Sequence, residues 1–522
     1  MAVIDYLDRG CEINPQGVYL ASDGRGITYS QVRSFTSRLA NALVRAGLRA
    51  PAIGAVLSAN DPLAWQCTLA LWRAGLVWSP VNPRNTAEQI VAQLSAFDCE
   101  ILFLQSAFAP LLATHQSSLS KIKHFICIDG PAPENLPRCV SLLEWMAGCH
   151  DTTPALISAM DEVCAITPTG GTTGQPKGVM NTHRSFQTMV ANWLSVLSYG
   201  ADEPIVNLAA APLTHTAGVF TFMATLRGGR VVILPRPDPQ LLVDTIERER
   251  ITELFLPPTV IYALLDLPGI ERRDFSSLRY FLYGAAPMAA DKLRRALDVF
   301  GPVMVQGYGQ SEAPAAISCL RPAEHFDGKA IASNTRLSSC GRAFPFTTVS
   351  IRDDSDRALA TGEIGEICVR GDVVMKGYYK DPQRTAEAIV AGWLRTGDVG
   401  FLDADHLLHI TDRKKDIIIT GGFNVFSVEV EAAINAHAAV RDCAVIGVPH
   451  DKWGEAVKAI VELRPGCTLS PDELLAFCKE RLGGVRTPKS IDFIEQLPRS
   501  AAGKVLKSAL REPFWTAHSR RV

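Results

Sequence analysis

The chain has 522 residues, of which 47% are hydrophobic and 20% are charged, the balance of an ordinary globular protein. Because one hydrophobic core seldom organises so long a chain, we expect two or more domains. Lysine and arginine number 52 against 54 aspartates and glutamates, so the net charge of −2 provides no field that would attract nucleic acid or an acidic membrane. The ligand must therefore be recognised locally.

Thirteen cysteines are scattered along the chain without a Cys-x-x-Cys pair. Their odd number, and a start (Met-Ala-Val-Ile-Asp) with neither a basic segment nor a long apolar core, argue against secretion. No run approaches the roughly 18 apolar residues that a membrane span requires. We therefore predict a cytoplasmic protein with no membrane span and no nucleic-acid partner, whose cysteines serve as small core residues.

In chain order, short apolar runs alternate with amphipathic segments, which is typical of α/β layers. Buried strands are predicted at residues 101–104, 125–128, 163–167, 230–234, 252–256, 279–283 and 303–306. A helix is predicted to begin at Pro239, where Asp238 can cap it, and Leu241, Leu242 and Ile246 give it an apolar face.

Further along, residues 364–370 and 400–410 are predicted to form hairpin strands, and a domain change is predicted near residues 412–416. A compact α+β pattern follows. It consists of a helix capped by Ser427 and ending near residue 438, strands at 443–448 and 457–463, and a helix that starts at a Ser470–Glu473 capping box and stops near Gly483. The sequence thus predicts an α/β protein: a large multi-layered domain of residues 1–412, with α/β subdomains and a β-rich subdomain, and a small α+β domain of residues 413–522.

The most informative segment is Thr-Pro-Thr-Gly-Gly-Thr-Thr-Gly-Gln-Pro-Lys-Gly at residues 167–178, directly after a predicted strand. Glycines let backbone amides approach an oxyanion, threonine hydroxyls add donors, and the lysine adds a positive charge. A common P-loop is excluded, because Pro176 intervenes and Gly178 stands where that motif has serine or threonine. A glycine-rich surface turn is the alternative to a polyphosphate cradle. The residues assigned to the cradle are Thr169, Gly170, Gly171, Thr172, Thr173, Gly174 and Lys177.

This segment resembles the phosphate-binding signature of the adenylate-forming superfamily, which comprises acyl- and aryl-CoA synthetases, peptide-synthetase adenylation domains and firefly-type luciferases. The resemblance extends along most of the chain, and its motifs occur in the family's order. Gly170 stands where the family usually has serine, so one hydroxyl donor is lost, which backbone amides can replace. The resemblance implies that residues 1–412 form an AMP-binding adenylation domain and that residues 413–522 form a mobile lid with a catalytic lysine.

Residues 306–312 resemble the family's adenine- and magnesium-binding turn. Tyr308 can stack on a purine, the Ser311 hydroxyl can reach the α-phosphate, and Glu312 is a hard oxygen ligand suited to Mg²⁺. Threonine is commoner in the family at Ser311. On its own, the segment would be better explained as a loop after a strand with a solvated glutamate. The residues assigned to the turn are Gln306, Gly307, Tyr308, Gly309, Ser311 and Glu312.

Three further matches concern the nucleoside. Gly284, Ala285 and Ala286 resemble the segment between adenine and the acyl group, where small residues let a planar base slide against the backbone; a simple strand-to-helix turn is the alternative. By resemblance, Asp398, at a strand-and-turn junction, accepts hydrogen bonds from the ribose hydroxyls, and Arg413 reaches the same sugar and phosphate. Taken singly, each is more often a surface salt-bridge partner.

The remaining matches concern catalysis and domain movement. Lys504 matches the lysine that stabilises the transition state when a carboxylate attacks the α-phosphate, where preorganised positive charge lowers the barrier. His215 matches a histidine beside the carboxylate, although a satisfied core histidine is about equally expected. Lys415 stands at the family's hinge, and Gly421 and Gly422 would border the pantetheine tunnel after rotation.

The sequence therefore predicts an ATP-dependent, AMP-forming acid–CoA ligase that uses Mg²⁺ and coenzyme A. A carboxylate and ATP give acyl-AMP and pyrophosphate, and a thiol then expels AMP. Residues 214–225 contain no acidic side chain that would hold an amino-acid ammonium, so a fatty or other hydrophobic (aryl or alicyclic) acid is favoured. The residues that suggest an apolar cavity are Phe220, Phe222, Met223, Ala285, Ala313, Pro314, Ala315 and Ala316.

Three other functions stay open. A stand-alone adenylation enzyme would load a carrier protein in place of CoA. A luciferase-type oxygenase would share the fold and the first half-reaction. A nucleotide-binding regulator without turnover is disfavoured by the joint presence of Glu312, Asp398, Arg413 and Lys504. The oligomeric state is not determined by these motifs, and a homodimer is one candidate.

Overall fold

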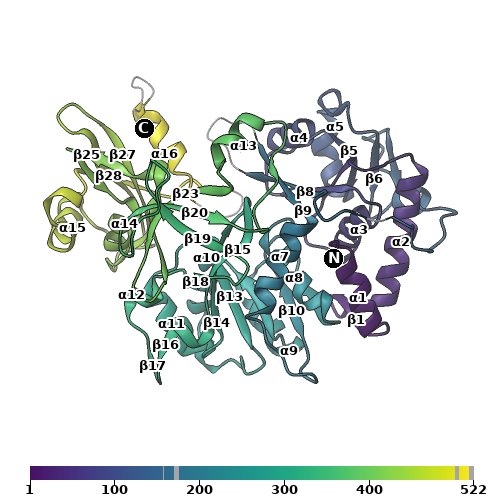
Figure 1. Cartoon of the computed structure of the whole chain (residues 1–522), viewed down its shortest axis with the longest axis horizontal. Coiled ribbons are helices and arrows are strands. Elements are labelled where there is room, and N and C mark those ends of the chain that lie inside the picture. The colour runs from purple at the N-terminus through teal and green to yellow at the C-terminus, as the bar shows by residue number, and fades with distance from the viewer. Residues whose placement is uncertain (157, 170–175, 500–504, 516–522) are drawn as a thin grey trace. The chain divides into compact units, whose positions relative to one another are not determined.

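The structure is a computed structural model that describes residues 1–156, 158–169, 176–499 and 505–515 (Figure 1). The chain divides into two compact units, of which the first comprises Met1–Val349 and Val369–Leu394 and the second Ser350–Cys368 and Arg395–Val522. The predicted boundary between residues 412 and 413 falls inside the second unit and stays a prediction. Among the described residues, no helix combines the length and the apolar character needed to cross a membrane.

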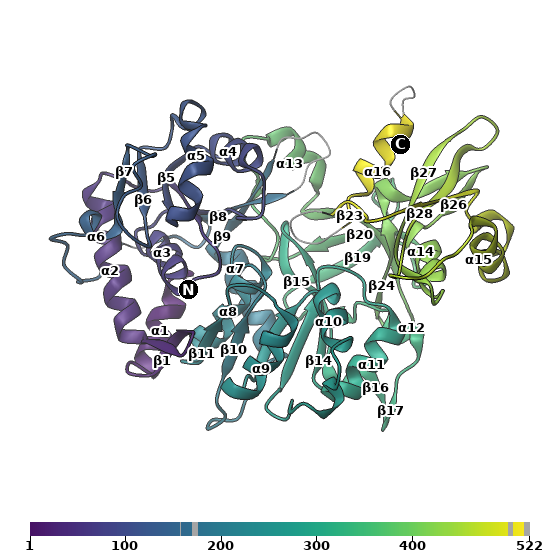
Figure 2. The ribbon, with the colours of Figure 1, turned by 180° about the vertical axis from the view of Figure 1, so that it is seen from behind.

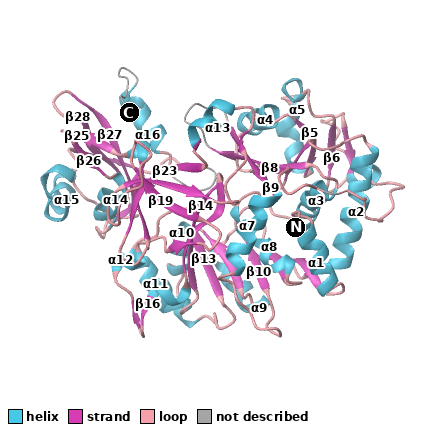
Figure 3. Ribbon diagram, in the orientation of Figure 1, coloured by secondary structure: helices cyan, strands magenta, loops and turns pink. Residues whose placement is uncertain are grey.

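An eight-stranded sheet forms one part of the first unit. In spatial order its strands are β21 (Gly377–Tyr378), β9 (Lys177–Thr182), β8 (Val163–Thr169), β4 (Val77–Pro80), β3 (Ile53–Leu57), β5 (Cys99–Leu104), β6 (His124–Cys127) and β7 (Cys139–Ser141). The strands from β8 to β7 are parallel, whereas β8–β9 and β9–β21 are antiparallel. Helices α2 (Tyr29–Arg45), α3 (Pro62–Arg73) and α4 (Ala87–Ala96) accompany this sheet (Figure 3). The strands predicted at 101–104, 125–128 and 163–167 are confirmed to within one or two residues.

A nine-stranded sheet forms the other part of the first unit. Its strands in spatial order are β18 (Arg342–Ala343), β15 (Ala313–Leu320), β14 (Met304–Gln310), β13 (Tyr280–Gly284), β12 (Glu253–Leu256), β10 (Val206–Ala209), β11 (Arg230–Ile233), β1 (Val18–Ser22) and β2 (Arg25–Thr28). Apolar side chains of its strands share one core with α9 (Pro239–Glu249), α10 (Pro258–Leu265) and α11 (Ala290–Phe300). Figure 2 shows these three helices over the strands.

Side chains of β12 point alternately to the two faces of the sheet, and both faces are covered by helices. Leu254 and Leu256 belong to the core under α9–α11, whereas Phe255 stacks on Phe220 of α8 (Thr216–Leu226) with ring centroids 5.2 Å apart. Successive strand residues point to opposite faces, so α8 covers the face that α9–α11 do not. The predicted cap of α9 is confirmed, because a carboxylate oxygen of Asp238 accepts from the Leu241 amide at 3.0 Å.

Two groups of strands lie mainly in the second unit. The strands β19 (Thr348–Arg352), β20 (Gly365–Arg370), β23 (Trp393–Leu402) and β24 (Leu408–Arg413) form a β-rich sheet. The C-terminal sheet has the order β26 (Phe423–Val425), β25 (Ile418–Thr420), β28 (Gly454–Leu463), β27 (Val440–His450), with β29 (Ser490–Ile494) paired to β28. The helices α14 (Ser427–Asn435) and α15 (Pro471–Arg486) share its core, and α16 (Lys507–Trp515) follows. The predicted strands at 443–448 and 457–463 are confirmed.

The helix boundaries of the second unit are partly corrected. Ser427 does not cap α14: it is the first helical residue, Phe426 precedes it, and the helix ends at Asn435, three residues earlier than predicted. The capping box at the start of α15 is confirmed, since the Glu473 amide donates to Ser470 Oγ at 3.3 Å. Gly483 has a φ of +70° and interrupts the helix where a stop was predicted. Eleven of the thirteen cysteines are buried, as predicted.

Candidate active site

The two ends of the glycine-rich segment (residues 167–178) lie in paired antiparallel strands. Thr169 ends β8, Lys177 begins β9, and their Cα atoms are paired in the register. A P-loop opens a helix, whereas this segment connects two strands, so the exclusion of a common P-loop is confirmed. Five predicted cradle residues lie outside the described residues: Gly170, Gly171, Thr172, Thr173 and Gly174.

The predicted adenine- and magnesium-binding turn is also a hairpin. The strand predicted at 303–306 continues to Gln310 and pairs with β15, so the segment after Gln306 is strand and only Ser311 and Glu312 form the turn. The alternative prediction, that residues 307–312 form a loop after the strand, is therefore wrong. Tyr308, the predicted stacking residue, is buried in the strand at 9% exposure.

Backbone strands approach one another closely around this hairpin. A Cβ at Gly284 would lie 2.3 Å from the Gly307 carbonyl oxygen, and one at Gly309 would lie 2.6 Å from Ala315 Cα. Ala285 and Ala315 adopt left-handed φ angles of +66° and +48°. Such strain is typical of functional sites, where the surrounding structure maintains it. Ala285 is exposed next to the close contact, as a residue in contact with a ligand would be.

A cluster of three aromatic residues, Trp193, Phe220 and Phe344, packs against the hairpin through Trp193. Trp193 of α7 (His183–Leu194) donates from Nε1 to the Ala315 carbonyl at 2.9 Å, and a Cβ at Gly307 would lie 2.8 Å from its ring. The rings of Phe220 and Phe344 pack on Trp193 with centroids 4.9 and 5.0 Å away. Trp193 was not predicted as a site residue, because it carries no motif of its own.

Glu312 is fixed at the tip of the hairpin. Its Oε1 accepts from the Tyr378 hydroxyl at 2.8 Å, and its carbonyl oxygen accepts from the Met375 amide at 2.8 Å. The neighbouring Ser311 carbonyl accepts from Asn181 Nδ2 at 3.2 Å. Burial, followed by the charge of the Glu312 carboxylate, raises the pKa of Tyr378, so the phenol is protonated and acts as the donor. No sequence motif pointed to Tyr378.

The chemistry of this turn fits Mg²⁺. The second oxygen of Glu312, Oε2, accepts no hydrogen bond within the described part of the chain, and a half-buried carboxylate oxygen is a ligand that Mg²⁺ prefers. Two buried amide oxygens, Asn181 Oδ1 and Gln306 Oε1, likewise find no donor among residues that the structure describes. Because Mg²⁺ commonly takes one or two carboxylates and completes its shell with phosphates and waters, a single carboxylate such as that of Glu312 would suffice as the protein ligand.

His215 lies at the N-terminus of α8, and hydrogen bonds fix its tautomer. Asn82 Oδ1 accepts from the Arg84 amide at 3.0 Å, so the Asn82 amide group faces His215 Nε2 at 3.2 Å. Nε2 is therefore an acceptor, and Nδ1–H donates to the Thr214 carbonyl at 2.7 Å. In this orientation both ring nitrogens bond within the protein, and contact with a substrate would need the ring to turn.

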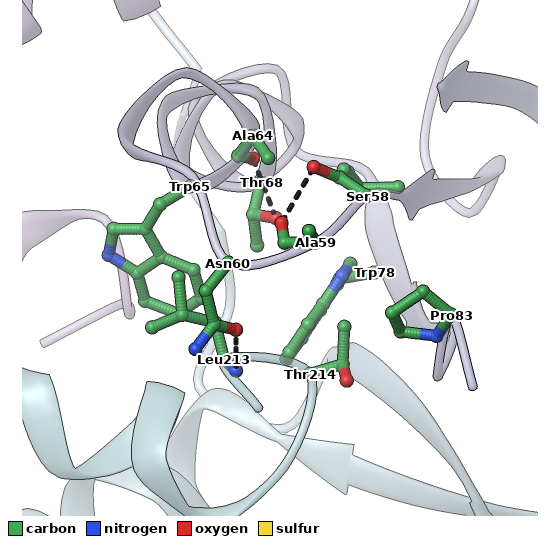
Figure 4. Close-up of a pocket in the computed structure, with 11 residues that line it drawn as sticks. Ser58, Ala59, Asn60, Ala64, Trp65, Thr68, Trp78, Pro83, Leu213 and Thr214 are labelled. Atoms are coloured by element: carbon green, nitrogen blue, oxygen red, sulfur yellow. Dashed lines mark hydrogen bonds between the residues drawn. The ribbon is translucent and has the colours of Figure 1, made fainter. Parts of the chain in front are cut away.

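A cavity of about 20 Å³ lies beside the Thr214 segment (Figure 4). Asn60 closes one side of it, because its Oδ1 accepts from the Leu213 amide at 2.9 Å. Trp78 Nε1 is buried in the wall and has no partner among the described residues. The cavity has room for one water molecule, which would satisfy that donor.

In the second unit, the two predicted ribose residues are neighbours. Asp398 on β23 and Arg413 on β24 are paired in the register, and Arg413 Nε lies 3.2 Å from Asp398 Oδ1. Asp398 lies within the ten-residue strand and not at a strand-and-turn junction as predicted; Gly397, with a φ of +71°, is the irregular residue. The Asp398 side chain is 6% exposed and that of Arg413 is 52% exposed.

Gly421 and Gly422 connect β25 and β26 in a two-residue turn. Their φ angles are +58° and +84°, which is the requirement of a type I′ hairpin and favours glycine at both positions. The Gly421 amide donates to the Trp453 carbonyl at 2.9 Å. Phe423, the next residue, is 61% exposed. The turn thus presents backbone and an aromatic ring on the surface of the second unit.

The predicted catalytic residue Lys504 lies outside the described residues, which resume at Val505. Arg499 and Val505 form a β-bridge, and Lys507 follows at the start of α16. Lys507 Nζ lies 2.7 Å from Glu431 Oε1 and donates to Ser427 Oγ at 2.6 Å. Burial raises the pKa of Glu431 to about 7, although the nearby Lys507 opposes the shift.

Asp412 completes this buried cluster. One of its carboxylate oxygens accepts from the Ser427 amide and the other from the Arg413 amide at 2.7 Å. Burial raises the pKa of the Asp412 carboxyl. Burial lowers the pKa of Lys507, but the carboxylates of Glu431 and Asp412 together raise it by more. The net shift of the Lys507 pKa is therefore upward, and the ammonium is stabilised. No sequence motif named above includes this cluster.

Comparisons with known families cover most of the chain. The model of the AMP-binding enzyme family matches residues 7–379, and that of the AMP-binding enzyme C-terminal domain matches residues 429–504. Medium/long-chain-fatty-acid–CoA ligase FadD8 of Mycobacterium tuberculosis is 38% identical over 402 residues, 75% of this chain and 69% of the relative. Feruloyl-CoA synthase of an Amycolatopsis species is 34% identical over 508 residues, 97% of this chain and 98% of the relative.

Solved structures have the same fold. ATP-bound MatB from Rhodopseudomonas palustris is similar with a TM-score of 0.88 and 27% identity, over 99% of this chain and 100% of that one. The α/β fold class is thereby confirmed, as is a large N-terminal part followed by a smaller C-terminal part. The family matches and the resemblance of the motifs agree: the chain belongs to the AMP-binding enzymes of the adenylate-forming superfamily and is an AMP-forming acid–CoA ligase that uses ATP, Mg²⁺ and CoA.

Proposed function

We propose that the protein joins a hydrophobic carboxylic acid, fatty or aryl, to coenzyme A. In the first step a carboxylate oxygen forms a bond to the α-phosphorus of ATP, the bond to the β-phosphate oxygen breaks, and pyrophosphate leaves. In the second step the CoA sulfur forms a bond to the acyl carbon, the bond from that carbon to the phosphate oxygen of AMP breaks, AMP leaves, and the thiol proton passes to water. The observation that carries the proposal is the β14–β15 hairpin, which combines a Mg²⁺-type carboxylate with a closely packed backbone.

The residues of the hairpin take distinct roles in this proposal. Glu312 would hold Mg²⁺, which when bound neutralises charge on the phosphates. Gly284, Gly307 and Gly309 allow the close packing that shapes the hairpin, since a side chain at any of the three would meet neighbouring protein atoms at 2.3 to 2.8 Å. Lys504 would supply positive charge to the pentacoordinate phosphorus, and the remaining cradle residues would bind the β- and γ-phosphates.

The choice of a hydrophobic acid is supported by the surroundings of the hairpin. Trp193 packs against Gly307 of β14, and Phe220 packs on Trp193 with ring centroids 4.9 Å apart, so this side of the hairpin is apolar. Transfer of an apolar tail to such surroundings contributes roughly 0.8 kcal/mol per methylene. Two relatives, one named for medium- and long-chain fatty acids and one for feruloyl-CoA, bracket the class.

A panel of acids tests the substrate class. Pyrophosphate release is measured with straight-chain fatty acids of increasing length, hydroxycinnamic acids, short dicarboxylic acids and amino acids, each with and without CoA. We expect turnover with the first two groups only, rising with apolar surface. Preferred use of a dicarboxylic or amino acid would contradict the proposal. Lys504→Ala is the control, because release that persists in this variant does not come from the assigned chemistry.

The acceptor is tested separately. Free CoA and a phosphopantetheinylated carrier protein are offered to the preformed acyl-AMP, and the thioester is detected by mass spectrometry. The exposed turn of Gly421, Gly422 and Phe423 supports a pantetheine arm as the ligand, which both acceptors share. We expect transfer to free CoA at millimolar concentration or below. Transfer to the carrier protein alone would replace CoA ligation by carrier loading.

A further inference from the structure

Residues 375–381 form a strap that joins the glycine-rich segment to the magnesium-type carboxylate. At one end, the Met375 amide donates to the Glu312 carbonyl at 2.8 Å. In the middle, Gly377 and Tyr378 pair with Met180 and Val179 of β9, the strand that follows the glycine-rich segment. At the other end, the Tyr379 amide donates to the Gly178 carbonyl at 2.7 Å. The strap therefore touches both predicted phosphate-binding segments within the first unit.

Contacts of the main chain hold the strap in position. Gly377 has a φ of +147°, and a Cβ there would lie 2.7 Å from Thr385 Cγ2 of α13 (Pro382–Ala388), so this approach needs glycine. The Tyr378 amide donates to Thr385 Oγ1 at 2.9 Å, and that hydroxyl donates to the Asp381 carbonyl at 2.8 Å. The Tyr378 hydroxyl takes no part in these contacts and serves the carboxylate at the hairpin tip.

We propose that Tyr378 is a positioning residue for Glu312: its hydroxyl fixes Oε1 and so presents Oε2 to Mg²⁺ and the phosphates. The inference rests on the proposed role of Glu312 as the magnesium ligand. A glutamate side chain has three rotatable bonds and, when only half-buried, samples several rotamers unless a partner holds it. The 2.8 Å bond from the phenol selects one of them. Partners of this kind typically change metal affinity or activity roughly 10- to 100-fold when removed.

Tyr379 supplies a matched control on the same strap. Its hydroxyl donates to Asp98 Oδ2 at 3.0 Å, so it too is a phenol hydrogen-bonded to a carboxylate. Asp98 lies next to α4 and bonds Lys121 and Lys380, which places this pair outside the hairpin. Removal of either hydroxyl costs one hydrogen bond to a carboxylate and leaves the ring in place. A purely structural role would therefore give the two Tyr→Phe variants similar properties.

The experiment compares Tyr378→Phe, Tyr379→Phe and Glu312→Gln in the full-length protein. Binding of Mn²⁺ is measured by electron paramagnetic resonance in the presence of an α,β-methylene ATP analogue, which cannot release pyrophosphate. The Mg²⁺ concentration for half-maximal acyl-AMP formation is the second readout. We expect Tyr378→Phe to weaken Mn²⁺ binding and raise the half-saturating Mg²⁺ about 10-fold, with Tyr379→Phe within about twofold of wild type and melting temperatures similar for the two variants.

Two results would overturn the inference in distinguishable ways. If Tyr378→Phe binds Mn²⁺ as the wild type does while Glu312→Gln loses it, then Tyr378 has no positioning role and the assignment of Glu312 stands. If Glu312→Gln also binds Mn²⁺ normally, then the magnesium ligand of the proposed function is itself misassigned. Equal weakening in Tyr378→Phe and Tyr379→Phe would reduce the effect to general loosening of the strap.

Discussion

Replacement of Lys507 by methionine should destabilise the second unit through the buried carboxylates that it leaves behind. The ammonium lies 2.7 Å from Glu431 Oε1, and the side chains of Lys507 and Glu431 are 17% and 16% exposed. Asp412, at 2% exposure, belongs to the same cluster. Methionine preserves most of the apolar stem of the lysine. It removes the ammonium, which is the only cation bonded to Glu431 among the residues that the structure describes. The variant therefore isolates the charge from the packing.

The magnitude follows from the burial of the partners. Removal of one member of a buried ion pair costs roughly 3–5 kcal/mol, because the other charge is left uncompensated. The second unit has about 150 residues, for which 1 kcal/mol corresponds to roughly 2–4 °C, so the melting temperature at pH 8 should fall by roughly 6–20 °C. At pH 6 the fall should be smaller, since Glu431, with a pKa of about 7 even in the wild type, takes up a proton and its charge disappears.

Differential scanning calorimetry at both pH values measures these shifts. The double variant Lys507→Met/Glu431→Gln should recover part of the loss at pH 8, because a neutral amide replaces the unpaired carboxylate. A shift below about 2 °C in the single variant at pH 8, or a shift that does not shrink at pH 6, would refute the reasoning. Strict additivity of the two substitutions would do the same, since coupled partners must deviate from it.

Three further outcomes are expected. Gly284→Ala should raise the KM for ATP and cost about 1–3 kcal/mol of stability, because the new methyl group meets the Gly307 carbonyl oxygen at 2.3 Å. Gly130→Ala is the control, since its new methyl group would have no atom within 4 Å. It should change neither the KM in an ATP titration nor the melting temperature. Lys415→Pro should leave acyl-AMP formation intact and slow thioester formation, measured as separate half-reactions; equal loss of both would remove the hinge assignment. Because burial raises the pKa of Glu431 from 4.5 to about 7, the wild type loses stability as the pH rises from 4.5 to 7. Glu431→Gln has no such loss, so the melting temperature of the wild type minus that of the variant should decline over this pH range.

Much of the fold was predictable because buried parallel strands have continuous apolar sequences. The strands β5, β8 and β12 follow from such runs, and α9 follows from its cap and its apolar face. The end of β14 was predicted at Gln306, but the strand continues through Gly307 and Gly309 to Gln310. Those glycines are required where Trp193 and Ala315 pack against the strand, a contact between residues distant in sequence.

The site was predictable only where its residues belong to local motifs. Glu312 was found from the segment around it, whereas Tyr378 lies 66 residues away and reaches it through the pairing of β21 with β9. The error at Ser427 has the same origin. A serine before an apolar run favours a cap, but here Lys507, 80 residues further on, donates to the hydroxyl, and the amide donates to Asp412.

The buried cluster also constrains how a hinge at Lys415 can work. Asp412 precedes the hinge and accepts from the Ser427 amide, whereas Asp416 follows it and accepts from Arg511 of α16 at 2.9 Å. A rotation at Lys415 must therefore separate Asp412 from Ser427 while α16 stays with Asp416. The arrangement described is stabilised by a contact that a rotated one lacks, and Lys507 strengthens it by drawing both carboxylates together. If Lys415 is the hinge, these buried charges favour the arrangement described over a rotated one.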